Sequence, residues 1–198
     1  GPFQKRTLAG HQYACIIVDH FSRYVFVDFI PSKHARNTLV SYQRFCAHTR
    51  TRPTHVHSDG GPEFQGCFSK FLRDNLVKQT YSCPYSAFQN SIVERRVRTL
   101  KEMARRNMLE SGFPDEFYAR AMHTGAVQLN QHPVHNDPLH SGTTPFALMF
   151  PGEQPPPLRV FGSVAYTLLL PKAVRRDNLK FPGKVGWFIG YSDYSRDF

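Results

Sequence analysis

Near the start of the chain, apolar side chains gather in two short runs, residues 13–18 and 24–30, both rich in β-branched and aromatic residues. Runs of this length and composition are typical of strands. The polar segment 19–23 between them predicts a tight turn, so the two runs are expected to form an antiparallel hairpin. Two more short runs, residues 54–58 and 79–83, predict further strands.

Elsewhere the apolar positions recur at the three- and four-residue spacing of a helix. This spacing predicts a helix opening after Pro31, then helices over residues 64–76, 92–109, 114–129 and 144–150, while residues 159–170 and 185–191 become β-rich again. The order of strands and helices up to residue 150 predicts an α/β fold, in which helices cover both faces of a mixed sheet.

The fifteen prolines of the chain are concentrated late, with a Pro-Pro-Pro run at residues 155–157. This shift in composition predicts two domains, a packed core over residues 1–150 and a small β module over residues 155–198. An extra hairpin packed on the core is the alternative interpretation of the second segment.

Basic residues outnumber acidic ones, 25 against 15, for a formal charge of +10. That excess favours phosphate backbones or anionic surfaces as partners, although composition alone fits a merely soluble basic protein equally well. No run of eighteen apolar residues occurs, so no membrane span and no membrane partner are expected. His132, His135 and His140 resemble a ligand spacing, but without a cysteine partner a polar loop is favoured over a zinc site. The four singly placed cysteines are expected to be reduced, mostly buried thiols.

Two carboxylates carry the candidate chemistry. Asp59 ends a predicted strand and precedes two glycines, and Glu94 lies in the first turn of a long predicted helix. Arg98 and Lys101 fall four and seven residues after Glu94, on the same helix face. A divalent ion on the acids and a phosphate backbone on the cations would suit metal-assisted phosphoryl transfer. From these residues alone, a solvated helix with Glu94 paired to Arg98 is the favoured alternative.

Longer motifs change that balance. The segments HSDGGPEF (57–64), SCPY (82–85), QNSIVER (89–95) and RTLKEMAR (98–105) closely resemble the integrase of copia-type long-terminal-repeat retrotransposons. Weaker matches extend the resemblance in the same order over segments 19–24, 142–145, 158–162, 165–166 and 186–191. The resemblance therefore covers essentially the whole chain.

The resemblance implies a ribonuclease-H-like core with a mixed five-stranded sheet flanked by helices, its first strand largely upstream of Gly1, followed by an SH3-like module truncated at Phe198. It further implies an Asp-Asp-Glu site for two Mg²⁺ or Mn²⁺ ions. Asp59 matches the second acid and Glu94 the third, 35 positions apart, one fewer than usual in the family. Gly1-Pro2 matches the dipeptide after the first acid, which is expected just upstream. Asp19 is expected to cap a turn instead, and this chain alone is expected to be inactive.

In the family, the implied activity is metal-dependent 3′-end processing and strand transfer by a polynucleotidyl transferase. The implied partners are retrotransposon cDNA ends and target DNA, with a homo-oligomer working in the nucleus and cytoplasmic retrotransposon particles before that. The residues expected to contact DNA are Tyr85, Gln89, Arg95, Arg96, Arg98, Lys101 and Arg105. Gly60 stands where the family usually has Asn, and Ala87-Phe88 replaces a Pro-Gln pair. Because of these departures, a decayed or domesticated non-enzymatic DNA-binding or assembly module is the alternative.

Overall fold

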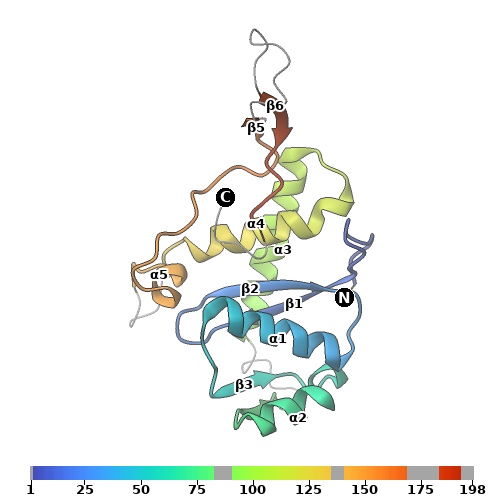
Figure 1. Ribbon diagram of the computed structural model, residues 1–198, viewed down its shortest axis with the longest axis vertical. Helices are drawn as coiled ribbons and strands as arrows, with labels where there is room; N and C mark the ends of the chain where they lie inside the picture. The colour runs from blue at the N-terminus through green and yellow to red at the C-terminus, as the bar shows by residue number, and fades with distance from the viewer. Residues whose placement is uncertain (1, 83–90, 135–140, 169–182, 193–198) are drawn as a thin grey trace, which may run out of the picture.

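The computed structural model describes residues 2–82, 91–134, 141–168 and 183–192, and its elements form stacked layers (Figure 1). In chain order the elements are β1 (Tyr13–Val18), β2 (Val25–Ile30), α1 (Ala35–Thr49), β3 (His55–Ser58), the 3₁₀ turn η1 (Pro62–Phe64), α2 (Cys67–Asp74), β4 (Lys78–Tyr81), α3 (Ser91–Ser111), the 3₁₀ turn η3 (Asp115–Phe117), α4 (Tyr118–Asn130), α5 (Pro145–Met149), β5 (Val164–Leu168) and β6 (Gly183–Trp187).

The predicted hairpin is confirmed. Strands β1 and β2 pair antiparallel, from Tyr13 opposite Ile30 to Val18 opposite Val25. The connecting turn closes through Asp19, whose backbone N–H donates to the Tyr24 carbonyl at 2.9 Å. Arg23 has a φ of 62°, the left-handed conformation that a tight turn requires.

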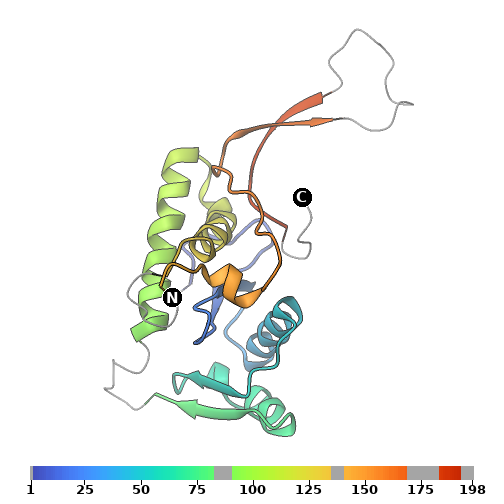
Figure 2. The ribbon, with the colours of Figure 1, turned by 90° about the vertical axis from the view of Figure 1, so that its left-hand side faces the viewer.

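The alternation of side chains along β2 sets the layering. Val25 and Val27 point into the main core, where they pack with residues of α3 and α4. Phe26 points the other way and meets Phe45 of α1 with ring centroids 5.7 Å apart. Because successive side chains of a strand face opposite sides, the hairpin is covered by α1 on one face and by α3 and α4 on the other (Figures 1 and 2).

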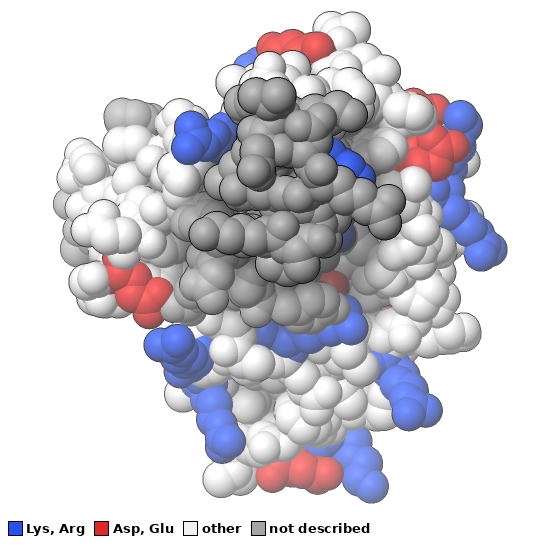
Figure 3. Space-filling model, turned by 45° about the horizontal axis from the view of Figure 1, so that its top comes forward, with Lys and Arg blue, Asp and Glu red and all other residues white. Residues whose placement is uncertain are grey.

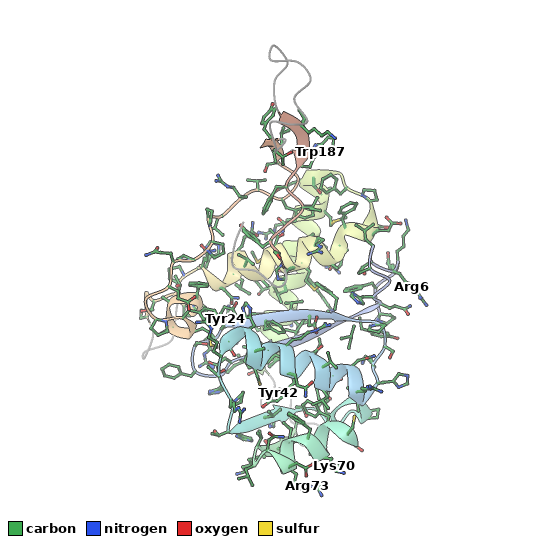
Figure 4. All side chains as sticks on the ribbon, viewed as in Figure 1. Arg6, Tyr24, Tyr42, Lys70, Arg73 and Trp187 are labelled. Carbon is green, nitrogen blue, oxygen red and sulfur yellow. The ribbon has the colours of Figure 1, made fainter. Side chains whose placement is uncertain are left out.

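A second hydrophobic cluster joins α1 to α2, the helix that connects the parallel strands β3 and β4. Tyr42 of α1 packs against Phe68 and Leu72 of α2, and in Figure 4 its side chain lies in the space between the two helices. Both Phe68 and Leu72 are almost fully buried. This packing fixes α2, and with it the turn that follows β3.

The close approach of α3 and α4 depends on Gly125. A Cβ at this position would lie 3.1 Å from the Cβ of Met103, so even alanine would require a small shift in this tightly packed contact. Ala104 and Ala121 are buried in the same interface, and the Asn107 amide donates to the Ala121 carbonyl at 3.1 Å.

The α/β class, with mixed strand directions and helices on both faces, is confirmed, but a single five-stranded sheet is not. In the described residues the strands form three separate pairs, antiparallel β1–β2, parallel β3–β4 and antiparallel β5–β6. A joint sheet would need neighbouring strands about 4.8 Å apart with a continuous ladder, and no ladder joins β1–β2 to β3–β4 in this part of the chain.

The segment after the proline run is tied to the main core. Phe161 is 2% exposed and packs with Val25 and Leu100, and its ring meets Phe113 edge-on at 5.6 Å. The Tyr191 hydroxyl donates to the Pro157 carbonyl at 2.9 Å. Strands β5 and β6 extend beyond this anchor, and Trp187 lies on the extended hairpin (Figure 4). The division into two domains stays a prediction.

Within the described ranges, no helix has the length and apolarity that crossing a membrane requires. Three cysteines are seen as free thiols, half-buried Cys15 and Cys46 and exposed Cys67, while Cys83 lies outside the described residues. None of these three is fully buried, so the expectation of mostly buried cysteines is not met here, and their reduced state stays a prediction.

Candidate functional site at the end of strand β3

Asp59 stands directly after β3, at the carboxyl end of the parallel pair. Ser58 before it is buried, whereas Asp59 itself is exposed. Its Oδ1 accepts a hydrogen bond from the Gly61 N–H at 3.1 Å, and the Gln65 amide closes the turn by donating to the Gly60 carbonyl at 3.0 Å. The fold therefore holds an open carboxylate on a braced turn, which is the arrangement that a strand-end ligand requires.

Phe64 anchors this turn to α2 and β4. Its ring meets Phe68 at 5.9 Å, and its carbonyl accepts from the Ser69 hydroxyl and from the Gln79 amide, each at 2.8 Å. Beside Gly60, α2 and β4 border a hollow of about 700 Å³, lined in part by Arg73 and Tyr81. The turn is thus fixed on its inner side and has open space next to it.

A second acid, which the sequence did not single out, lies on the same turn. Glu63 forms an ion pair with Lys33, with Nζ and Oε1 3.2 Å apart, and its side chain is only 16% exposed. Lys33 precedes α1 and is thirty positions away in the chain. No local sequence pattern links positions so far apart, so only the folded chain shows this pair.

Glu94 lies in the first turn of α3 and is exposed, as predicted. Arg98, Lys101 and Arg105 are exposed too, and their spacing places all four side chains on one face of the helix. The exposed Arg95 lies beside this face. Like charges next to one another along this helix favour an anionic partner.

Arg96 lies on a different side of α3. It is half-buried, and burial, with Arg23 and Arg95 nearby, lowers the pKa of its guanidinium. Arg23 belongs to the turn of the β1–β2 hairpin, so Arg96 faces the body of the protein while its neighbour Arg95 faces solvent.

The chain passes from Asp59 to Glu94 through the carboxyl end of β4. Because β3 and β4 are parallel, their carboxyl ends share one edge, and Figure 2 shows α3 starting on that side of the molecule. The contact between Asp59 and Glu94 stays a prediction. Tyr85 and Gln89 belong to segment 83–90, outside the described residues, and the roles of all the predicted DNA contacts stay predictions as well.

Asp19 has the structural role expected for it. Its Oδ2 accepts from both the backbone N–H and the hydroxyl of Ser22, each at 2.7 Å. These two hydrogen bonds hold the hairpin turn, so the interpretation of Asp19 as a turn-capping residue is confirmed.

Among the described residues, no group of three His, Cys, Asp or Glu side chains is placed to hold a metal ion. His132 is exposed, and His135 and His140 lie outside the described residues. The oxygen donors around Asp59 suit a hard cation such as Mg²⁺ or Mn²⁺ better than a soft one. The Asp59 turn therefore fits part of the expected metal site.

Comparison with known proteins places these features in a family context. Residues 4–87 match the family described as Integrase core domain. The chain is 27% identical over 191 residues to the retrovirus-related Pol polyprotein from transposon RE2 of Arabidopsis thaliana, covering 94% of this chain and 13% of that protein. It is 24% identical over 138 residues to the corresponding polyprotein from transposon TNT 1-94 of Nicotiana tabacum, covering 67% of this chain and 10% of that protein. The chain thus spans a small part of these relatives.

Solved structures share the fold. The catalytic core domain of HTLV-2 integrase, in complex with magnesium, superposes with a TM-score of 0.57 at 22% identity, covering 73% of this chain and 89% of that one. A chain of the simian T-cell lymphotropic virus intasome, in complex with the PP2A regulatory subunit B56 gamma, gives a TM-score of 0.60 at 20% identity, covering 87% of this chain and 60% of that one. The expected ribonuclease-H-like architecture is thereby confirmed.

Proposed function

Residues 4–87 of this chain match the Integrase core domain family, and from that match we propose that the chain forms the catalytic core of a retrotransposon integrase. The proposed reaction is metal-dependent trimming of DNA 3′ ends, followed by transfer of those ends into target DNA. The observation that supports this proposal most directly is the exposed Asp59 carboxylate at the carboxyl edge of β3–β4. From the same edge the chain continues toward α3, which carries Glu94.

In this proposal Asp59 and Glu94, with a further Asp placed upstream by the family resemblance, hold two Mg²⁺ or Mn²⁺ ions. Bound divalent ions neutralise charge on the reacting phosphate and favour ionisation of the attacking water or hydroxyl. The chain contributes rigidity: the braced turn keeps Asp59 in one orientation, and α3 carries Glu94 on a regular helix. Since the acids act through bound ions, no covalent protein intermediate is required.

The cations of α3 are proposed to bind the DNA backbone. Arg98, Lys101 and Arg105 share the face of Glu94, so phosphates held by them would lie along the same helix. Arg95 is exposed beside this face and is proposed to contact phosphate as well. Half-buried Arg96 lies on another side of the helix, so the DNA contact predicted for it is left out of this proposal. Tyr85 and Gln89 are proposed to touch the DNA end from the segment before α3.

Partners and location follow from the same premise. The solved HTLV-2 cores are trimeric and dimeric forms, and the simian virus chain belongs to an intasome. We propose that the complete protein forms a homo-oligomer on retrotransposon cDNA ends and target DNA. We further propose that it works in the nucleus after assembly in cytoplasmic particles.

A non-enzymatic DNA-binding or assembly module is the second candidate. The favouring observation is that Gly60 and Ala87-Phe88 depart from the family pattern close to the expected site, while the basic face of α3 needs no metal ion. A chain that has lost catalysis would keep this face and its DNA affinity.

The two candidates are separated by a joining assay on a preformed branched DNA with Mn²⁺. The protein assayed is the chain preceded by the segment that carries the predicted upstream Asp. Asp59→Asn and Glu94→Gln remove charge with little change in volume, so each is expected to abolish joining and to leave DNA binding within about twofold. Glu102→Gln, exposed on the same helix, is the control and should remain active. No joining by the unsubstituted protein, with intact DNA binding, would favour the non-enzymatic module.

A further inference from the structure

The turn after β3 brings two carboxylates to one point. A Cβ built on Gly61 would lie 2.6 Å from Oε2 of Glu63 and 3.0 Å from Oδ1 of Asp59. Both oxygens therefore border the same small space, and they are no farther apart than the sum of those two distances. A side chain at this position would require the Glu63 carboxylate to shift, although the φ of −60° is accessible to any residue.

Two like charges this close would repel each other unless one were compensated. Lys33 provides the compensation, since its Nζ lies 3.2 Å from Oε1 of Glu63. The lysine engages Oε1, which leaves Oε2 on the side of Gly61 and Asp59. Glu63 is also held by the η1 turn, whose next residue, Phe64, is anchored in the α1–α2 cluster. Its carboxylate is thus held by Lys33 on one oxygen and directed toward Asp59 with the other.

We propose that Glu63 is an auxiliary acid of the Asp59 site and that Lys33 sets how much of its charge acts there, so that the pair tunes the affinity of the site for a divalent cation. The inference rests on the proposed function, because it takes Asp59 as a cation ligand. In this proposal Asp59 is the ligand of the cation. Glu63 does not bind the cation directly; its negative charge, held next to Gly61, attracts the cation to the site.

The charges give the two partners opposite effects. Removing the negative charge with Glu63→Gln should weaken Mn²⁺ binding roughly three- to tenfold, the effect of one unit charge on a divalent ion a few ångströms farther away than its ligand. Lys33→Gln removes the compensating positive charge and should tighten binding by a similar factor. The double variant should return close to the starting affinity. A purely structural role predicts weaker binding in both single variants.

Gly61→Ala gives a second check that changes no charge. The added methyl group would press on the Glu63 carboxylate and on Oδ1 of Asp59. Because both carboxylates would have to shift, Mn²⁺ binding should weaken at least as much as in Glu63→Gln, by roughly threefold or more. Lys5→Gln is the matched control, because Lys5 forms a comparable ion pair with Asp115, at 3.5 Å, in another part of the molecule.

The measurement is a Mn²⁺ titration followed by paramagnetic broadening of the Gly60 and Gly61 amide signals, with thermal unfolding of each variant to confirm folding. Asp59→Asn distinguishes a failure of the proposed function from a failure of the auxiliary role of Glu63. If Asp59→Asn leaves the broadening unchanged, the metal role in the proposed function fails. If Asp59→Asn abolishes the broadening while Glu63→Gln and Lys33→Gln have no effect or change it in the same direction, the proposed function stands and the auxiliary role of Glu63 is wrong.

Discussion

Asn130 shows how much a single side chain contributes at the residue scale. Its Oδ1 accepts from the Val25 N–H and its Nδ2 donates to the Val25 carbonyl, both at 2.8 Å and both buried. The amide thus continues the backbone pairing of β2 and fastens it to the end of α4, 105 positions away.

Asn130→Ala would leave two buried backbone groups without partners. We expect the free energy of unfolding to fall by about 2–4 kcal/mol, since each unsatisfied group costs on the order of 1–3 kcal/mol. Urea unfolding measures this loss. Asn75→Ala is the control: the Asn75 amide donates to the Phe71 carbonyl at an exposed helix end, so the loss there should stay below about 1 kcal/mol.

Cys15 predicts a pH dependence at the same scale. Burial raises the pKa of its thiol from 9.0 to about 12, with the Asp28 and Glu63 carboxylates adding to the shift. The unfolded chain ionises Cys15 near pH 9 and the folded chain does not, so folding retains a proton between those values. The resulting stability is complete below about pH 9 and is lost as pH rises toward 12.

Urea unfolding at a series of pH values above 9 should therefore show stability falling with pH. Cys15→Ala should flatten part of that slope, by at most about 1.4 kcal/mol per pH unit. Burial also raises the pKa of Cys46 and of Tyr118, so some slope should remain. Cys67→Ala, at an exposed site on α2, should leave the slope unchanged.

At the scale of elements, α3 is expected to dominate DNA binding. The apparent association constant for duplex DNA falls with salt, with a slope near 0.9 per phosphate contact. Replacing Arg98, Lys101 and Arg105 with Gln should reduce that slope by about 2–3. Binding to a fixed duplex over a salt series measures it.

A matched control removes the same charge elsewhere. Lys70, Arg73 and Lys78 are exposed on α2 and β4, and Figure 4 shows Lys70 and Arg73 at the far end of the molecule from Trp187. Replacing these three with Gln should change the slope much less. An equal reduction of the slope in both triple variants would contradict a DNA-binding face on α3. Binding would then depend on overall charge, because Lys and Arg side chains also occur at several separate places on the face shown in Figure 3.

The boundaries of the helices show where the local sequence pattern was sufficient and where it was not. The helix expected over residues 64–76 begins only at Cys67, because Gly66 has a φ of 60° and a ψ of −121°, outside the helical region. The helix expected from Pro114 begins with the 3₁₀ turn η3 before α4. The helix expected over residues 144–150 is confirmed as α5, and Thr144 caps it, its Oγ1 accepting from the Ala147 N–H at 3.1 Å.

At the scale of the whole molecule, Phe161 connects the late segment to the core. Phe161→Ala would leave a cavity among Val25, Leu100 and Met122, and we expect a loss of about 3–5 kcal/mol. Tyr166→Ala, on the exposed face of β5, should change stability by less than about 0.5 kcal/mol. Thermal or urea unfolding compares the two. A negligible effect of Phe161→Ala would mean that the late segment is energetically separate from the core.

The sequence by itself determined the hairpin, the order of the later elements and the strand-end position of Asp59, because these depend on local periodicity and turn residues. Motifs spread along the chain also gave its resemblance to integrases, and residues 4–87 match the Integrase core domain family. The tertiary structure alone decided that the strands form separate pairs, that Phe161 belongs to the main core, and that Arg96 is half-buried. It also decided that Lys33 meets Glu63 beside Asp59. These features join residues distant in the chain, and contacts of that kind are fixed by packing and charge in the folded state, which no local pattern encodes.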